Sequence, residues 1–207
     1  MAEQRLLVLG AGAHARAVAD VARACGWTVA GFVGAPGAPL TVAGVVGSDD
    51  DLPRLVASRK FDGAVVGVGN SALARRPTLF ARLRDLRIAT PTLVHPTAAV
   101  SSSARLGAGS LVFPHVTVGA EVVVGEDAVL YSGAVVEHDC RIGDHAYLAP
   151  GVIVCGNVRV DAGAFLGAGA IVVPGVVIGK EAIVPAGARV ASDVPARTKF
   201  SGSKEHR

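Results

Sequence analysis

The chain has 207 residues, 51% of them hydrophobic and 4% aromatic, with a formal net charge of +3 at pH 7; this length allows one or two domains with a sizeable core. The chain has no Lys/Arg run dense enough to indicate nucleic-acid binding, whereas its scattered basic residues suit an anionic small-molecule ligand such as a nucleotide. The three cysteines include no Cys-x-x-Cys pair, which favours a reducing compartment. The first strand is too short for a signal peptide and no apolar stretch is long enough to span a membrane, so we expect a cytoplasmic protein without a membrane partner.

The first part of the chain has the pattern of a small α/β domain. Short apolar runs read as strands, and apolar residues at helical spacing alternate with them. The expected elements are, in order, strand 5–9, helix 15–26, strand 28–33, helix 51–60, strand 64–68 and helix 75–86. Gly26 is expected at the C-terminal end of the first helix. The alternation predicts a parallel sheet with a Rossmann-like turn after its first strand.

That turn is Gly10-Ala11-Gly12, which follows a strand and precedes a helix. Backbone N–H groups at a helix N-terminus can hold phosphate. However, Ala15 takes the third glycine position of the dinucleotide pattern, and Val33-Gly34 stands where an acidic residue would end the second strand. We therefore do not expect NAD, and the turn either binds a different nucleotide or is structural.

The second part of the chain is a repeat of six residues. Every sixth residue from Val100 to Val190 is aliphatic, and a second set, four residues further on, is uniformly small. A period of six fits short strands joined by tight corners, three to a coil, so that residues eighteen apart stack. This predicts a parallel β-helix, and glycines after the aliphatic position, such as Gly107 and Gly125, are expected to supply backbone freedom near the corners.

The composition change predicts three parts of the chain. A Rossmann-like domain is expected over residues 1–94, a β-helix over 95–198 and a polar tail over 199–207.

Within the repeat, His138 and Asp139 form an unusual pair on the outside of the predicted prism. A neutral imidazole is a natural general base, and a neighbouring carboxylate can fix its tautomer. The alternative is a solvated surface pair. Cys140 falls on the inward register and is expected to be structural. Because His115, His138 and His145 do not stack at multiples of eighteen, no metal site is expected.

Three segments in order carry a resemblance to a known family: residues 8–16 (VLGAGAHAR), 66–70 (VGVGN) and 136–144 (VEHDCRIGD). They resemble the bacterial sugar acetyltransferases that pair an N-terminal Rossmann-like domain with a left-handed β-helix. The resemblance covers nearly the entire chain. It implies acetyl-CoA as co-substrate and, as acceptor, the 4-amino group of a nucleotide-linked deoxy sugar.

The resemblance also implies roles for individual residues. His138 matches the general base, Asp139 the acid that orients it, and Gly156 the backbone N–H that faces the thioester carbonyl. Ala168 and Ala186 fall on the wall that carries the pantetheine arm. The residues that match the nucleotide-sugar pocket are Gly10, Gly12, His14, Gly69 and Asn70.

Two departures from the family and two alternatives bear on function. Val33-Gly34 replaces an acidic pair that contacts the nucleotide base, and Tyr147 stands where a second His approaches the acetyl group. These departures favour one alternative, a non-catalytic scaffold that binds a nucleotide sugar. The other alternative is O-acetylation of sialic acid or another sugar hydroxyl. Because a single prism leaves flat apolar faces, and the family's active site lies between subunits, a homotrimer is expected.

Overall fold

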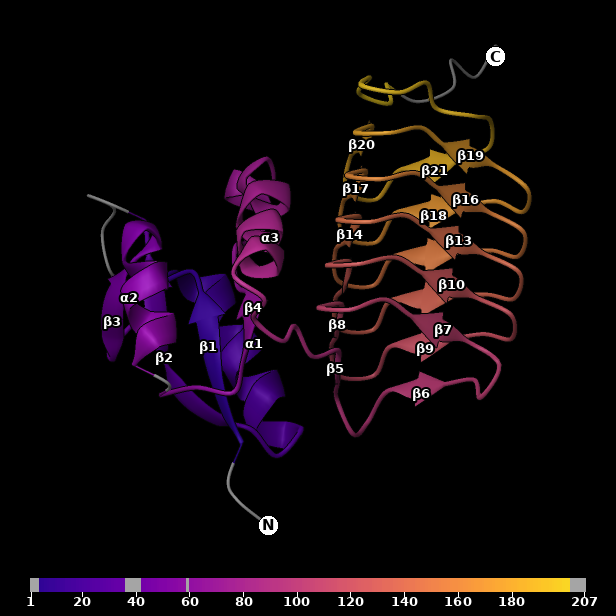
Figure 1. Cartoon of the computed structure of the whole chain (residues 1–207). Helices are drawn as coiled ribbons and strands as arrows, with labels where there is room; N and C mark the ends of the chain where they lie inside the picture. The colour runs from indigo at the N-terminus through magenta and orange to yellow at the C-terminus, as the bar shows by residue number, and fades with distance from the viewer. Residues whose placement is uncertain (1–3, 36–41, 59, 202–207) are drawn as a thin grey trace. The chain divides into compact units, whose positions relative to one another are not determined.

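The computed structural model describes residues 4–35, 42–58 and 60–201. The chain divides into two compact units, Met1–Pro96 and Thr97–Arg207 (Figure 1). Residues 202–207 of the expected polar tail, and Arg59 of the expected second helix, lie outside the described residues. None of the helices in the described ranges has the length and hydropathy needed to cross a membrane.

The first unit is the predicted α/β domain. Its sheet has the order β3-β2-β1-β4, and all neighbouring strands are parallel. The elements are β1 (Arg5–Leu9), α1 (Ala13–Ala24), β2 (Thr28–Gly34), β3 (Val45–Ser48), the 3₁₀-helix η1 (Asp49–Asp51), α2 (Leu52–Ala57), β4 (Gly63–Val66), η2 (Asn70–Ala72) and α3 (Arg75–Asp85). The next strand along the chain, β5 (Leu93–Val94), is not part of this sheet and belongs to a six-stranded sheet of the β-helix. Strand β3 was not predicted, and the second helix begins as a 3₁₀ turn and is shorter than expected.

The end of α1 confirms the role expected of Gly26. Its φ is +83°, in the left-handed region that glycine adopts at low cost. The Gly26 N–H donates to the Arg23 carbonyl at 2.9 Å, and the Trp27 N–H donates to the Ala22 carbonyl at 3.0 Å. This pair of bonds is a Schellman motif, which closes the helix and turns the chain into β2.

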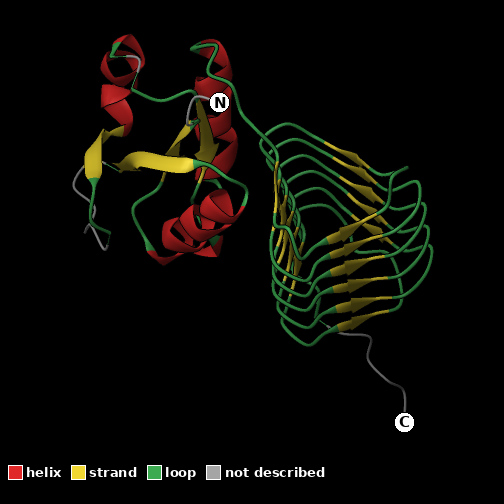
Figure 2. Ribbon diagram, turned by 90° about the horizontal axis from the view of Figure 1, so that it is seen from below, coloured by secondary structure: helices red, strands yellow, loops and turns green. Residues whose placement is uncertain are grey.

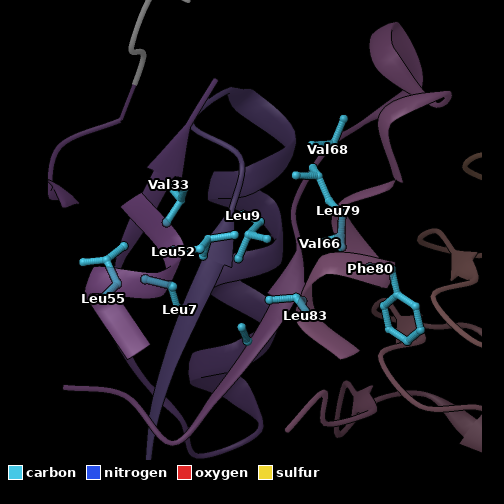
Figure 3. Close-up of a cluster of buried hydrophobic side chains, with 11 residues drawn as sticks. Leu7, Leu9, Val33, Leu52, Leu55, Val66, Val68, Leu79, Phe80 and Leu83 are labelled. Carbon is cyan, nitrogen blue, oxygen red and sulfur yellow. The ribbon is translucent and has the colours of Figure 1, made fainter. Parts of the chain in front are cut away.

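Both faces of this sheet are covered, as a parallel sheet requires. Leu7 and Leu9 of β1 belong to a buried cluster that includes Leu52 of α2 and Leu83 of α3 (Figure 3). The alternate β1 residues are also fully buried, and on α1 Ala15, Val18 and Ala22 are fully buried. The carboxyl ends of the four strands therefore form one fixed edge, at which the intervening loops meet.

The second unit is the predicted left-handed β-helix, seen as stacked coils in Figure 2. Each strand pairs in parallel with the strand eighteen residues further on; Val123, for example, pairs with Arg141, and Arg141 with Arg159. Three sheets result, and β12, β13 and β14 each belong to a different one. The strands are β6 (Ala99–Val100), β7 (Arg105–Leu106), β8 (Leu111–Val112), β9 (Thr117–Val118), β10 (Val123–Val124), β11 (Val129–Leu130), β12 (Val135–Val136), β13 (Arg141–Ile142), β14 (Tyr147–Leu148), β15 (Ile153–Val154), β16 (Arg159–Val160), β17 (Phe165–Leu166), β18 (Ile171–Val172), β19 (Val177–Ile178), β20 (Ile183–Val184) and β21 (Arg189–Val190).

The glycines after the aliphatic positions have a different role from the one predicted. Gly107 and Gly125 are not in the left-handed region, so backbone freedom is not what they supply. A Cβ on Gly107 would lie 2.5 Å from the backbone carbon of Gly125, and one on Gly125 would lie 2.6 Å from the Asp144 nitrogen. These positions need glycine because successive coils approach each other too closely for a side chain.

Candidate active site

The His138–Asp139 pair occupies the corner between β12 and β13. Asp139 has φ of +60°, the left-handed conformation that lets the chain turn within two residues. Its Oδ2 accepts a hydrogen bond from His138 Nδ1 at 2.8 Å. Because a carboxylate can only accept, Nδ1 carries the proton of this bond, and in the neutral tautomer of the ring Nε2 has the lone pair. More than half of each side chain is exposed in the single chain, 57% for His138 and 53% for Asp139.

Gly156 lies one coil further on, directly against the His138 ring. A Cβ on Gly156 would be 2.7 Å from both Cε1 and Nε2 of that ring, so the imidazole can lie there only because the residue is glycine. The coils are joined at this corner by the Asn157 N–H, which donates to the His138 carbonyl at 3.0 Å. Among the described residues the Gly156 N–H has no acceptor. An oriented imidazole and a backbone N–H without an acceptor among the described residues therefore adjoin.

Ala168 and Ala186 lie at another corner of the prism. Ala168 sits between β17 and β18, and Ala186 is stacked on it one coil further on, where the Gly187 N–H donates to the Ala168 carbonyl at 2.8 Å. Both alanines are exposed. A single chain therefore does not bring them to His138.

The five residues expected to bind the nucleotide sugar do come together in the first unit. With Val33, Ala35 and other loop residues they line a cavity of about 390 Å³ at the carboxyl ends of the strands. The loops after β1 and β4 touch, since a Cβ on Gly10 would lie 2.5 Å from the Gly67 carbonyl oxygen. Gly12 is the N-cap of α1, whose first turn has no side-chain cap and no acidic residue. This end of the cavity is suited to an anion.

His14 is held neutral in the wall of this cavity. Burial, and then the positive charge of Arg76, lower the pKa of His14 to about 3. The ring packs on Gly69, where a Cβ would lie 2.9 Å from the His14 Cβ. Arg76 is completely buried and donates from Nη1 to the carbonyls of Val66 at 3.2 Å and Val68 at 2.7 Å. Arg76 thus fixes the loop after β4, a role that its sequence position on a helix did not reveal.

Sequence reasoning also missed two charged residues of the cavity, Asp49 and Arg75. Arg75 Nη2 donates to Asp49 Oδ2, which joins the start of α3 to η1. The signal was the run Ser48-Asp49-Asp50-Asp51, whose place at the sheet edge depends on the unpredicted strand β3.

The other singled-out residues have structural partners. His145 Nδ1 lies 2.9 Å from Oδ2 of the buried Asp127 one coil earlier, and this pair occupies a different corner from His138. Tyr147 belongs to a stack of aromatic rings along one sheet, 6.2 Å from Tyr131. Cys140 is buried, as expected. No group of three or more potential metal-ligating side chains occurs in residues 4–35, 42–58 and 60–201.

Comparison with known proteins relates both units to characterised families. Residues 5–79 match the PglD N-terminal domain family, and residues 121–156 match the bacterial transferase hexapeptide (six repeats) family. No curated protein sequence matches the chain.

Several solved structures match over both units. PerB from Caulobacter crescentus, in complex with CoA and GDP-perosamine, is 39% identical with a TM-score of 0.87, covering 94% of this chain and 92% of PerB. A variant of GDP-perosamine N-acetyltransferase from the same bacterium is 39% identical with a TM-score of 0.88, covering 94% and 91%. The acetyltransferase domain of PglB from Neisseria gonorrhoeae, in complex with acetyl coenzyme A, is 31% identical with a TM-score of 0.85, covering 98% of each chain.

Proposed function

This chain belongs to the sugar acetyltransferases that join a PglD N-terminal domain to a left-handed β-helix, and we propose that it acetylates the 4-amino group of a nucleotide-linked deoxy sugar. As a member of this family it is an acetyl-CoA-dependent sugar acetyltransferase. An amine as the acceptor is favoured because the relatives from Caulobacter crescentus are an N-acetyltransferase and a protein bound to GDP-perosamine.

The observation that carries this proposal is the corner formed by His138, Asp139 and Gly156. It combines an oriented imidazole, whose Nε2 can accept a proton, with a free N–H beside the same ring. Direct acyl transfer needs these two groups, a base for the attacking amine and a donor for the oxyanion. A protein that only binds a nucleotide sugar needs neither.

The reaction then follows from the geometry. The amine nitrogen attacks the acetyl carbonyl while His138 Nε2 takes one of its protons, and Asp139 stabilises the imidazolium that forms. The carbonyl oxygen becomes an oxyanion that accepts a hydrogen bond from the Gly156 N–H, a contact of this type contributing about 3 kcal/mol. The tetrahedral intermediate collapses with cleavage of the C–S bond. The CoA thiolate leaves and receives the proton from His138.

The cavity of the first unit would hold the nucleotide. Its glycine loops present the uncapped N-terminus of α1, which suits a pyrophosphate. His14, being neutral, contributes a hydrogen-bonding ring without adding charge there. Gly69 and Asn70, in the loop after β4, complete the lining of the cavity.

The active site is proposed to form between the subunits of a homotrimer. The outward residues of β12, β15 and β18 make an apolar row in which Ile153 is 38% and Ile171 40% exposed. The chain enters this face at the corner of Ala168 and leaves it at the corner of His138 and Gly156. A neighbouring copy that covers this row would bring the Ala168 corner of one chain toward the His138 corner of the next. The general base and the wall for the pantetheine arm would then line one site.

The first experiment measures release of CoA thiol from acetyl-CoA with GDP-, UDP- and dTDP-linked 4-amino sugars. We expect turnover with one of them, its loss in His138→Ala, and unchanged CoA binding by that variant. His145→Gln is the matched control, because His145 also pairs with an aspartate but lies at another corner; it should keep the wild-type rate. Transfer only to sugar hydroxyls such as those of sialic acid would replace N- by O-acetylation. Absence of acetyl-CoA binding would favour the scaffold.

The oligomeric state tests the shared site. Light scattering after size exclusion should give three chains for the wild type. Ile153→Glu should separate the chains and abolish turnover, since it places a charge in the apolar row. A monomeric wild type with full activity would contradict the arrangement.

A further inference from the structure

The nucleotide cavity runs along the carboxyl ends of the strands and has two chemically different parts. Gly10 and Gly12 follow β1, whereas Asp49 follows the edge strand β3. Strands β1 and β3 are separated by β2 alone, so the two parts lie about 10 Å apart, two strand spacings. The first part offers the uncapped N-terminus of α1. The second offers a carboxylate and a guanidinium.

Asp49 is the one aspartate of its run that lines the cavity. Asp51 accepts hydrogen bonds from the Ser48 N–H and hydroxyl and from Arg54, and Asp50 forms an ion pair with Arg82. The Asp49 side chain is only 12% exposed.

Asp49 and Arg75 are paired, but neither is saturated. One guanidinium nitrogen of Arg75 donates to Asp49 Oδ2, whereas Asp49 Oδ1 has no partner among the described residues. Arg75 keeps further N–H donors, since a guanidinium has five. Because the two charges compensate each other, the pair offers a pattern of donors and acceptors and only a weak net attraction for phosphate. Such a pattern recognises a planar, polar edge.

We propose that Asp49 and Arg75 recognise the nucleobase of the acceptor sugar nucleotide and select guanine. This rests on the proposed function, because it names the nucleotide for the same pocket. Guanine offers two adjacent donors, N1–H and the N2 amino group, to a carboxylate, and beside them two acceptors, O6 and N7, to an arginine. Uracil and thymine have a single N–H between two carbonyls, so a carboxylate that meets the N–H also faces a carbonyl oxygen. The pair therefore stands in for the acidic pair that is missing at Val33-Gly34.

The test measures binding of GDP, UDP and dTDP to the full chain by calorimetry, without acetyl-CoA or sugar. The wild type should bind GDP about 10-fold or more tightly than UDP, and Asp49→Asn should remove most of this preference while leaving UDP affinity unchanged. Asp50→Asn is the matched control, because Asp50 is its 77% exposed neighbour, paired with Arg82; it should behave as the wild type.

Three results would overturn the proposal. The first is equal affinity of the wild type for GDP and UDP. The second is an equal loss of affinity for both nucleotides in Asp49→Asn, because the pair would then only link α3 to η1. The third is the same loss of GDP preference in Asp50→Asn as in Asp49→Asn. The wild-type comparison decides even if a variant does not fold. Failure of the proposed function gives a different result. Selective GDP binding without acetyl transfer would contradict only the proposed reaction, whereas transfer to UDP-linked amino sugars would contradict only the proposed selection of guanine.

Discussion

Replacing Gly156 by alanine tests the proposed catalytic corner of His138, Asp139 and Gly156 with one methyl group. The new Cβ would lie 2.7 Å from Cε1 and Nε2 of His138, where carbon contacts are about 3.5–4 Å. The imidazole must therefore move by about 1 Å, which changes the position of Nε2 and the geometry of the hydrogen bond to Asp139. The backbone itself tolerates alanine, because Ala162, Ala168 and Ala186 occupy the same place in their hexads. The Gly156 N–H is retained, so the substitution acts on the base alone.

The expected effect is large on turnover and small on stability. A displacement of about 1 Å costs about 100-fold in rate, which corresponds to about 2.7 kcal/mol of activation free energy. The His138 ring is 57% exposed and can swing into solvent, so the free energy of unfolding should change by less than about 1 kcal/mol.

The assay is a double-mutant cycle on kcat for acetyl transfer, with urea unfolding of each variant. If Gly156→Ala acts only through the imidazole, it should cost about 100-fold in the wild type and almost nothing in His138→Ala. The reasoning is refuted if Gly156→Ala keeps more than half of the wild-type kcat. It is refuted equally if the double variant falls far below His138→Ala, because the methyl group would then disturb something other than the base.

Three further substitutions test the pocket and the coil. The pKa of His14 is about 3 in the folded state against 6.5 in the unfolded state, so the unfolded state binds the proton first and stability falls as the pH drops below 6.5. Between pH 7 and pH 5 the free energy of unfolding of the wild type, measured in urea, should fall by ~2 kcal/mol more than that of His14→Gln. Gly10→Ala places a Cβ 2.5 Å from the Gly67 carbonyl oxygen at a φ of +141°, and calorimetry should show about 10-fold weaker GDP binding, with a lower Tm. Asp127→Asn keeps a residue suited to the left-handed turn but weakens the buried bond to His145; it should cost about 1–3 kcal/mol in urea unfolding, and an unchanged midpoint would contradict this.

The β-helix could be predicted because its physical constraint repeats. Each coil needs an aliphatic residue at the same place, so a register of six residues specifies strand length, corner and stacking together. The need for glycine at Gly107 and its equivalents could not be predicted in this way. It arises because the backbone of the next coil comes too close for a side chain, not because of the local backbone conformation. Strand β3 is four residues long and only partly buried, and its pattern carries too little periodicity to distinguish it from a loop.

The same distinction applies to the site. His138 and Gly156 are eighteen residues apart, so the repeat alone predicts that they stack, and the resemblance supplied their roles. The charged residues of the cavity follow no such rule. Arg75 meets Asp49 and Arg76 meets the carbonyl of Val68 only because α3 packs beside α2 over one face of the sheet, and that packing depends on tertiary contacts.

The proposed site between subunits makes a prediction that a site within one chain cannot share. His138→Ala removes the base at one corner, and Ala168→Trp blocks the exposed wall at the other, so each variant alone should be inactive. In random trimers from an equal mixture, a site is intact when the chain that gives the base carries the tryptophan and its neighbour carries His138→Ala, which holds for about one site in four. Coexpressed chains should therefore recover about a quarter of the wild-type rate. If base and wall belonged to one chain, every site in the mixture would carry one of the two defects, and no activity would return.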